Sequence, residues 1–179
     1  MKNIAFIPAR LESKRFPNKV IKLILNLPMI EHVRRRAIVS KVFERILIVT
    51  NSNLIKKKMK KYNAKIVTTK QKHHNGTSRV SEISHNFNYD YGFVLFADEP
   101  LLSIKMLKKC EREIKKNKKA LVYNVVTNLK KGDNGSPQVV KCLINKSGFI
   151  NNYYRNKKIK IANSIVRKSS GILIFKIEL

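Results

Sequence analysis

The sequence is poor in cysteine and in long apolar runs. Its two cysteines, Cys110 and Cys142, lie far apart and form no CxxC pair, which excludes a disulfide framework and a cysteine-based zinc site. Reduced thiols fit a cytoplasmic protein, and we predict that compartment. No segment approaches the ~20 apolar residues that a membrane span requires. The apolar stretch at residues 4–8 is too short for a signal peptide, so we expect no membrane insertion.

Acidic residues are also scarce. The chain has 11 of them against 39 basic residues, which gives a formal net charge of +28 and a field that attracts polyanions such as nucleic acids or phosphate compounds. Lysine supplies 29 of the basic residues and arginine 10, whereas base-specific and phosphate-specific sites favour bidentate arginine. Lysine runs such as residues 56–58 fall on a helical pattern and fit a solvated face. No basic strip with interleaved aromatic residues is present, so a specific nucleic-acid-binding protein is the weaker alternative.

The sequence has no internal repeat and no linker rich in glycine, proline or serine. Its 179 residues, 43% of them apolar, suffice for one domain. Short apolar runs alternate with helix-length amphipathic segments, which predicts an α/β fold: a three-layer α/β/α sandwich with a mostly parallel, mixed sheet. The expected strands are residues 4–7, 45–50, 65–68, 93–96, 120–126, 139–144, 149–154 and 171–177. The last three are not separated by long helices, so the second half should be mixed sheet.

Three helices are expected in the first half. Pro28 opens the first, in the position that proline tolerates best. Ser52 or Asn53 caps the second, and the third covers residues 77–87. The residues expected to face the core are Ile30, Val33, Ala37 and Ile38 in the first helix, Leu54, Ile55, Met59 and Tyr62 in the second, and Val80, Ile83 and Phe87 in the third.

The loop after the first strand carries three cations, Arg10, Arg15 and Lys19, between the stiffening residues Pro8 and Pro17. In an open α/β sheet, ligands bind outside the carboxyl ends of the strands. The three cations are therefore placed to meet a polyphosphate, although a solvated basic loop would have the same composition.

A second polar segment, residues 73–79, runs into the start of the third helix. Free backbone N–H groups and the helix dipole favour anions there, and Gly76 would let the backbone approach a ligand closely. His73 and His74 are adjacent, but no acidic or thiol side chain shares the segment. This favours polar ligand contact or plain loop exposure over metal ligation.

A carboxylate, Asp98, follows the apolar strand at residues 93–96. At this position it could hold Mg²⁺ against substrate phosphates, or it could cap the following turn.

These segments, taken in order, resemble the acidic-sugar cytidylyltransferases, most closely the CMP-Kdo synthetase (3-deoxy-manno-octulosonate cytidylyltransferase) family. The likeness covers essentially the whole chain. The matching residues are Ile7 to Arg10 with Ser13, Arg15, Pro17 and Lys19; Pro28 to Ile30; His73, Gly76, Thr77 and Arg79; and Asp98 to Pro100. Further on, Ser136 to Lys141 is similar to the family's NPN-x-VK stretch, and Tyr154-Arg155 to its later SR pair.

The resemblance implies a nucleotide-diphospho-sugar transferase-like (Rossmann-like) fold. It implies transfer of CMP from CTP to a 2-keto sugar acid, Kdo or a related acidic sugar, with release of pyrophosphate, for lipopolysaccharide or other surface polysaccharide biosynthesis. It also implies Mg²⁺ as cofactor and a homodimer.

The same resemblance implies roles for individual residues. Arg15, Lys19 and Asp98 would be catalytic, and Asp98 would be the metal ligand. The acidic sugar would contact Gln138, Lys141 and Arg155, of which Arg155 can bind a carboxylate bidentately. The nucleotide would contact Pro8, Ala9, Arg10, Arg15, Lys19, His73, Asn75, Gly76, Thr77 and Arg79.

Several positions depart from the family pattern. Phe96-Ala97 stand where the family has Gln-Gly, so we expect a polar contact near the nucleotide to be lost. Ser169-Ser170 stand where the family has a His, and a Trp-containing insert is absent; these differences lie on the sugar side, so the acceptor need not be Kdo itself. The family's second metal-binding Asp comes from a segment beyond Leu179. We therefore expect a single cytidylyltransferase-like domain at residues 1–179 that lacks the family's C-terminal segment and has weakened or absent activity. Another sugar nucleotidyltransferase or glycosyltransferase of the same fold, or an inactive homologue, is the alternative.

Overall fold

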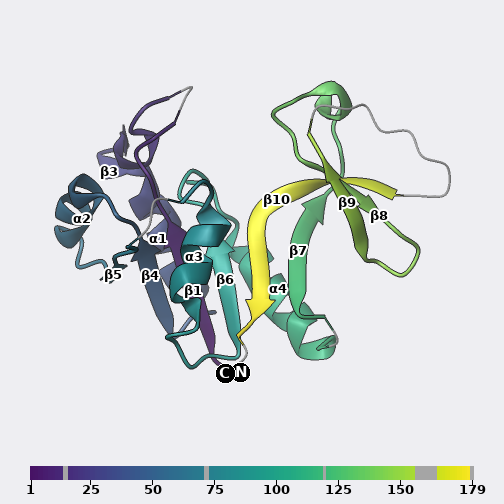
Figure 1. Cartoon of the computed structure of the whole chain (residues 1–179), viewed down its shortest axis with the longest axis horizontal. Helices are drawn as coiled ribbons and strands as arrows, with labels where there is room; N and C mark the ends of the chain where they lie inside the picture. The colour runs from purple at the N-terminus through teal and green to yellow at the C-terminus, as the bar shows by residue number, and fades with distance from the viewer. Residues whose placement is uncertain (14–15, 71–72, 119, 156–164, 178–179) are drawn as a thin grey trace. The chain divides into compact units, whose positions relative to one another are not determined.

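The computed structural model of the chain describes residues 1–13, 16–70, 73–118, 120–155 and 165–177 (Figure 1). The chain forms two compact units. Unit 1 comprises Met1–Tyr123 and Ile172–Leu179, and unit 2 comprises Asn124–Gly171. The single domain expected over residues 1–179 stays a prediction. No helix of the described ranges is long and apolar enough to cross a membrane.

Unit 1 is built on a mostly parallel sheet, as the alternating pattern predicts. Its strands lie in the order β5 (Ile66–Val67), β4 (Arg45–Val49), β1 (Asn3–Pro8) and β6 (Tyr91–Leu95), each parallel to its neighbour. The C-terminal part of β10 (Ile165–Lys176) then pairs antiparallel with β6. Every residue of β1 and β6 is buried, which is typical of strands covered on both faces.

Helices lie on both faces of this sheet, so the predicted three-layer arrangement is confirmed (Figure 1). α3 packs on β1 and β6, and its residues Val80 and Ile83 join Ile4, Phe6 and Val94 in one core cluster. α1 and α4 pack against each other, and α1 also contacts β1 and β4. The helices are α1 (Met29–Ser40), α2 (Asn53–Lys60), α3 (Gly76–Ser84) and α4 (Ile104–Lys116).

α4 is not among the helices expected from the sequence. Its signals are nevertheless ordinary ones: the Ser103 side chain caps it by accepting a hydrogen bond from the Met106 N–H at 3.2 Å. Leu107, Cys110 and Ile114 form a buried stripe at helical spacing.

Two expected core positions are wrong. Ile38 of α1 and Leu54 of α2 are 47% and 43% exposed, because each lies at the edge of the apolar stripe rather than within it. Pro28 is the N-cap of α1 and not its first helical residue, and α3 ends at Ser84, before Phe87. Phe87 still packs against the core from the following turn. The cap of α2 is Ser52, whose hydroxyl accepts from the Ile55 N–H.

A short hairpin precedes α1 and was not expected from the sequence. It consists of β2 (Leu23–Ile24) and β3 (Leu27–Pro28), and it follows a 3-10 turn, η1 (Lys19–Ile21). The turn residues Leu25 and Asn26 both have left-handed backbones, with φ of 46° and 64°. Two such residues make the tight turn that matches the twist of a two-residue hairpin.

Unit 2 is antiparallel, in agreement with the mixed second half that the sequence predicts. β8 (Lys141–Ile144) lies between β9 (Ile150–Tyr154) and the N-terminal part of β10. β7 (Val122–Thr127) also pairs with β10, and η2 (Asp133–Gly135) is a short 3-10 turn. The strand expected at residues 171–177 begins earlier, at Ile165, because residues 165–168 pair with β8.

Leu25 provides a test of the hairpin geometry. A left-handed backbone costs an L-residue roughly 1–2 kcal/mol, whereas asparagine adopts it readily. The Leu25 side chain is 88% exposed, so its removal loses little packing. We expect Leu25→Asn to raise the free energy of unfolding by about 1 kcal/mol and the melting temperature by about 2–4 °C.

The measurement is thermal and urea unfolding beside the control Leu101→Asn. Leu101 is 81% exposed but is not among the residues with a left-handed backbone. Equal effects of the two substitutions would show that surface hydrophobicity, and not backbone strain, decides the stability.

Candidate functional site

The candidate site lies at the carboxyl edge of the unit 1 sheet, where parallel strands deliver their following loops to one place. β1 ends at Pro8 and β6 at Leu95. The Ala9 N–H donates to the Val49 carbonyl at 2.9 Å, which fixes the start of the first loop to the end of β4. Pro8 and Ala9 are themselves buried, so they shape the loop, and their side chains do not face solvent.

Lys19 and Asp98 meet at this edge, although 79 residues separate them in the sequence. The Lys19 ammonium forms an ion pair with Oδ2 of Asp98. Asn18, in a left-handed backbone conformation with φ of 59°, turns the chain into η1 and so positions Lys19. The two side chains are 31% and 41% exposed, so both remain open to a ligand. The structure thus brings together a cation and the carboxylate that the sequence singles out.

Arg10 ties the first loop to the segment before α3. Its exposed guanidinium donates from Nη1 to the His74 carbonyl at 2.8 Å. A guanidinium has five N–H donors, so this bond leaves others for an anion. Arg15, which belongs to the same predicted set of cations, lies outside the described residues.

The start of α3 is held by local contacts. Asn75 is its N-cap and accepts a hydrogen bond from the Ser78 N–H at 2.8 Å, so its side-chain oxygen already serves the helix. A Cβ on Gly76 would lie 3.0 Å from Cγ of Pro8 and 3.2 Å from a ring carbon of Phe96. Gly76 therefore allows a close approach of the backbone to Pro8 and Phe96, and the approach to a ligand stays a prediction. Thr77 follows it in the first turn and is exposed.

Arg79 is placed differently from its expected position beside the nucleotide. It is only 3% exposed and donates from Nη1 to Oγ1 of Thr69 at 2.6 Å. Burial lowers the pKa of its guanidinium, while Glu12 and Glu82 oppose that shift and Arg10 adds to it. Arg79 thus supports α3 from inside.

His73 is also held by a protein partner. Its Nε2 lies 2.6 Å from Oε2 of Glu82, whose Oε1 accepts from the Lys70 N–H at 2.7 Å. Glu82 of α3 therefore fixes both ends of the segment from 70 to 73. In the part of the chain that is described, no group of three His, Cys, Asp or Glu side chains could hold a metal ion.

The residues expected on the sugar side belong to unit 2. Gln138 and Arg155 are exposed, and the Gln138 N–H donates to Oγ of Ser136 at 3.2 Å. Lys141, which was expected to face the acidic sugar, is instead fully buried. Its ammonium donates to the carbonyls of Ser136 at 3.0 Å and Arg155 at 2.7 Å.

Two supporting residues, Thr69 and Glu82, are absent from the sequence prediction. Thr69 directly follows the strand expected at residues 65–68, so its position at the carboxyl edge was a usable signal. Glu82 lies in the helix that begins at Gly76, but its bond to His73 depends on how the preceding loop folds back, which no local pattern reveals.

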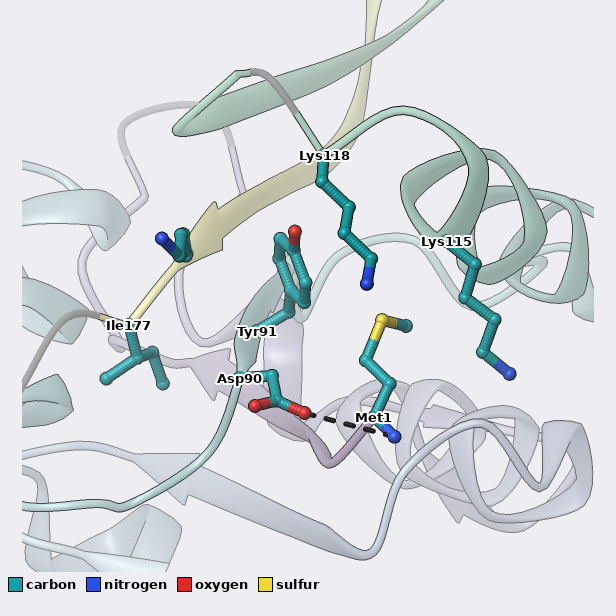
Figure 2. Close-up of a pocket in the computed structure, with 7 residues that line it drawn as sticks. Met1, Asp90, Tyr91, Lys115, Lys118 and Ile177 are labelled. Carbon is teal, nitrogen blue, oxygen red and sulfur yellow. Dashed lines mark ion pairs between the residues drawn. The ribbon is translucent and has the colours of Figure 1, made fainter.

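A pocket of about 540 Å³ lies at the opposite, amino edge of the unit 1 sheet (Figure 2). There Asp90 lies 3.9 Å from the nitrogen of Met1, and its Oδ2 accepts from the Lys2 N–H at 2.7 Å. None of the predicted site residues lines this pocket. Its lining residues are Met1, Asp90, Tyr91, Lys115, Lys118, Lys176 and Ile177.

Comparison with known proteins places the sequence near one family. A model of the family described as cytidylyltransferase matches residues 4–177. The chain is 28% identical over 158 residues to a 3-deoxy-manno-octulosonate cytidylyltransferase of Thermodesulfovibrio yellowstonii, covering 83% of this chain and 62% of that protein. It is 33% identical over 149 residues to one of Francisella tularensis, covering 80% and 58%. The chain thus spans roughly three fifths of the length of these curated relatives.

A solved structure of CMP:2-keto-3-deoxy-manno-octonic acid synthetase complexed with CTP has the same fold, with a TM-score of 0.87 and 23% sequence identity. The likeness covers 98% of this chain and 74% of that chain. At this level of identity the match establishes the fold.

The Thr69–Arg79 bond gives a stability test with a matched pair of variants. Thr69→Val keeps the shape of the side chain but leaves a buried guanidinium donor without its acceptor, so we expect a loss of about 1–3 kcal/mol. Thr69→Ser keeps the hydroxyl and should lose only about 0.8 kcal/mol for the methyl group. Urea unfolding measures both.

In an Arg79→Met background the Thr69→Val substitution should cost little, because the donor is gone. An equal cost in both backgrounds would show that Thr69 stabilises the protein without Arg79.

Proposed function

This chain belongs to the cytidylyltransferase family, and we propose that it transfers a cytidylyl group from CTP to the anomeric hydroxyl of a 2-keto sugar acid, with release of pyrophosphate. The acceptor is Kdo or a related acidic sugar. The names of the relatives and the CTP complexed in the similar solved structure support this choice. The product would feed the synthesis of lipopolysaccharide or another surface polysaccharide.

The observation that carries the proposal is the meeting of Lys19 and Asp98 at the carboxyl edge of the sheet, beside the segment that Arg10 holds. Attack on the α-phosphate of a nucleotide gathers negative charge on the nonbridging oxygens and on the departing pyrophosphate. Positioned cations stabilise that charge, and they do most of the work in phosphoryl and nucleotidyl transfer. This edge supplies such cations on rigid elements of the fold.

Lys19 and Arg10 would bind the triphosphate. The Lys19 ammonium is compact and would reach a phosphate oxygen by turning away from Asp98, its partner in this structure. Arg10 keeps its bond to the His74 carbonyl and offers its remaining N–H groups. Arg15 joins this set on the strength of the motif match. Thr77 and His74 border the place left for the nucleoside, since both are exposed at the start of α3.

Asp98 fits a magnesium ion that a nucleotide brings with it. Mg²⁺ is usually held by one or two carboxylates together with substrate phosphates and water. Asp98 supplies an exposed carboxylate, and within the described residues it belongs to no group of three metal-ligating side chains, so phosphate oxygens and water would complete the set. When bound, the ion would neutralise charge on the triphosphate.

The acidic sugar would be bound through unit 2. Arg155 is exposed and can bind the carboxylate through two parallel N–H bonds, and Gln138 can bind hydroxyl groups. Unit 2 contains ten basic residues and one acidic residue, Asp133, which is paired with Lys168 at 3.5 Å. This charge balance favours an anionic acceptor.

The state of assembly and the compartment stay predictions. A homodimer follows from the family resemblance. The two cysteines are free and buried, which agrees with the cytoplasm that the sequence predicts. One relative, from Arabidopsis thaliana, is named as mitochondrial; it is 28% identical over 148 residues, covering 82% of this chain and 51% of that protein.

The proposal is tested by measuring pyrophosphate release from CTP and Mg²⁺ in the presence of a panel of 2-keto sugar acids. We expect release with at least one acid and none with neutral sugars. Thermal shift with CTP, UTP, GTP and ATP separates this function from that of a transferase using another nucleotide. Stabilisation by a nucleotide other than CTP, with no release from CTP, would overturn the assignment.

Substitution of Lys19 tests the role of the ion pair. Lys19→Met removes a cation from the triphosphate and should lower kcat/KM for CTP by about 10²–10³-fold, the loss typical of one donor to a developing charge. Lys22→Met, which removes an exposed lysine three residues away, should change it less than about twofold. A similar loss in both variants would mean that the general positive field, and not Lys19, binds the nucleotide.

A further inference from the structure

The ammonium of Lys141 is the most deeply buried cationic group among the described residues of unit 2, with no exposure to solvent. Lysine is almost never fully buried unless its charge is paired. Lys141 begins β8 and lies opposite Tyr154 of β9 and Lys168 of β10, so neighbouring strands enclose it on both sides.

The partners of this ammonium are two backbone carbonyls. One belongs to Ser136, five residues earlier, at 3.0 Å, and the other to Arg155, fourteen residues later, at 2.7 Å. Among the described residues, no carboxylate forms an ion pair with Lys141. Burying a charge that only neutral groups satisfy is unfavourable, and an apolar residue of similar volume often serves stability as well. A role in arranging the two carbonyls accounts for the lysine better than stability does.

Each of the two backbone segments carries an exposed polar side chain. Ser136 stands two residues before Gln138, and its hydroxyl accepts from the Gln138 N–H. The second carbonyl is that of Arg155 itself. A single nitrogen atom therefore anchors the backbone at Ser136, two residues before Gln138, and at Arg155 itself.

We propose that Lys141 is a positioning residue for the acidic acceptor: it holds Gln138 and Arg155 in place without touching the sugar. The inference rests on the proposed function, in which Arg155 receives the carboxylate. It replaces the direct contact that the family resemblance suggests for Lys141, because a side chain with no exposure does not reach a ligand. The buried positive charge also adds to the field that favours an anion beside Arg155.

The kinetic test compares Lys141→Met with Lys146→Met, which removes an exposed lysine from the turn between β8 and β9. Lys141→Met should raise KM for the acidic sugar about tenfold or more and leave KM for CTP within about twofold. Lys146→Met should leave both values unchanged. A purely structural role would instead lower the active fraction, and with it kcat, at constant KM for both substrates.

A double-mutant cycle with Arg155→Met identifies the route of the effect. If Lys141 acts through Arg155, Lys141→Met should have almost no further effect on KM for the sugar once Arg155 is replaced. The same tenfold rise in the Arg155→Met background would overturn the proposal, since it would mean that Lys141 acts on the sugar by itself.

Hydrogen exchange separates failure of this inference from failure of the proposed function, because it needs no substrate. In Lys141→Met, the amides of residues 138–140 and 153–155 should exchange at least about tenfold faster, while those of β1 and β6 stay protected. Unchanged exchange at both segments overturns the positioning role even in an active enzyme. Faster exchange in a chain that shows no cytidylyltransferase activity would establish that Lys141 positions the backbone. It would at the same time reject the proposed acidic-sugar acceptor.

Discussion

The ion pair between Lys19 and Asp98 joins the two segments on which the candidate site depends. Each is placed by the end of a buried parallel strand, and β1 and β6 are neighbours in register, so their loops emerge side by side. That alignment brings together two charges that lie 79 residues apart in the sequence of a strongly basic chain. The pairing also keeps an exposed carboxylate neutralised by a cation that a triphosphate can recruit. One arrangement therefore serves the fold of this edge and, under the proposed function, the binding of a nucleotide.

The scarcity of acidic residues gives each carboxylate unusual influence on the fold. Glu31 is completely buried in the first turn of α1 and accepts from both Arg34 and Arg35. Arg34 also donates to the Tyr62 carbonyl, which ties α1 to the end of α2. Glu82 ties α3 to the segment before it, because its carboxylate contacts His73 and accepts from the Lys70 N–H. In a chain of net charge +28, these few anions fix where the nearby cations lie, and the remaining cations form the surface field.

Much of this arrangement follows from the sequence. Apolar runs give the strands of unit 1, and the loops that follow β1 and β6 bring Lys19 and Asp98 together at the carboxyl edge. The sequence does not predict which of the polar motif residues are buried. Arg79 and Lys141 lie in motifs that look like ligand contacts, yet both are inside, because their acceptors come from Thr69 and from the backbone at Arg155. Such acceptors depend on packing between distant segments, which a local pattern does not encode.

The cationic side chains of the recognised motifs therefore form two groups, which differ in whether their hydrogen-bond donors lie inside the protein or also face solvent. Arg79 donates to the Thr69 hydroxyl and Lys141 to two backbone carbonyls, both inside the protein. Lys19, Arg10 and Arg155 keep donors that face solvent. The buried cations act by holding their acceptors in place, because Lys141 donates to two carbonyls and Arg79 donates to the Thr69 hydroxyl. The exposed group can contact a ligand directly, and the buried group shapes the segments that surround it. The division explains why buried residues that support the fold can share a motif with residues that face solvent.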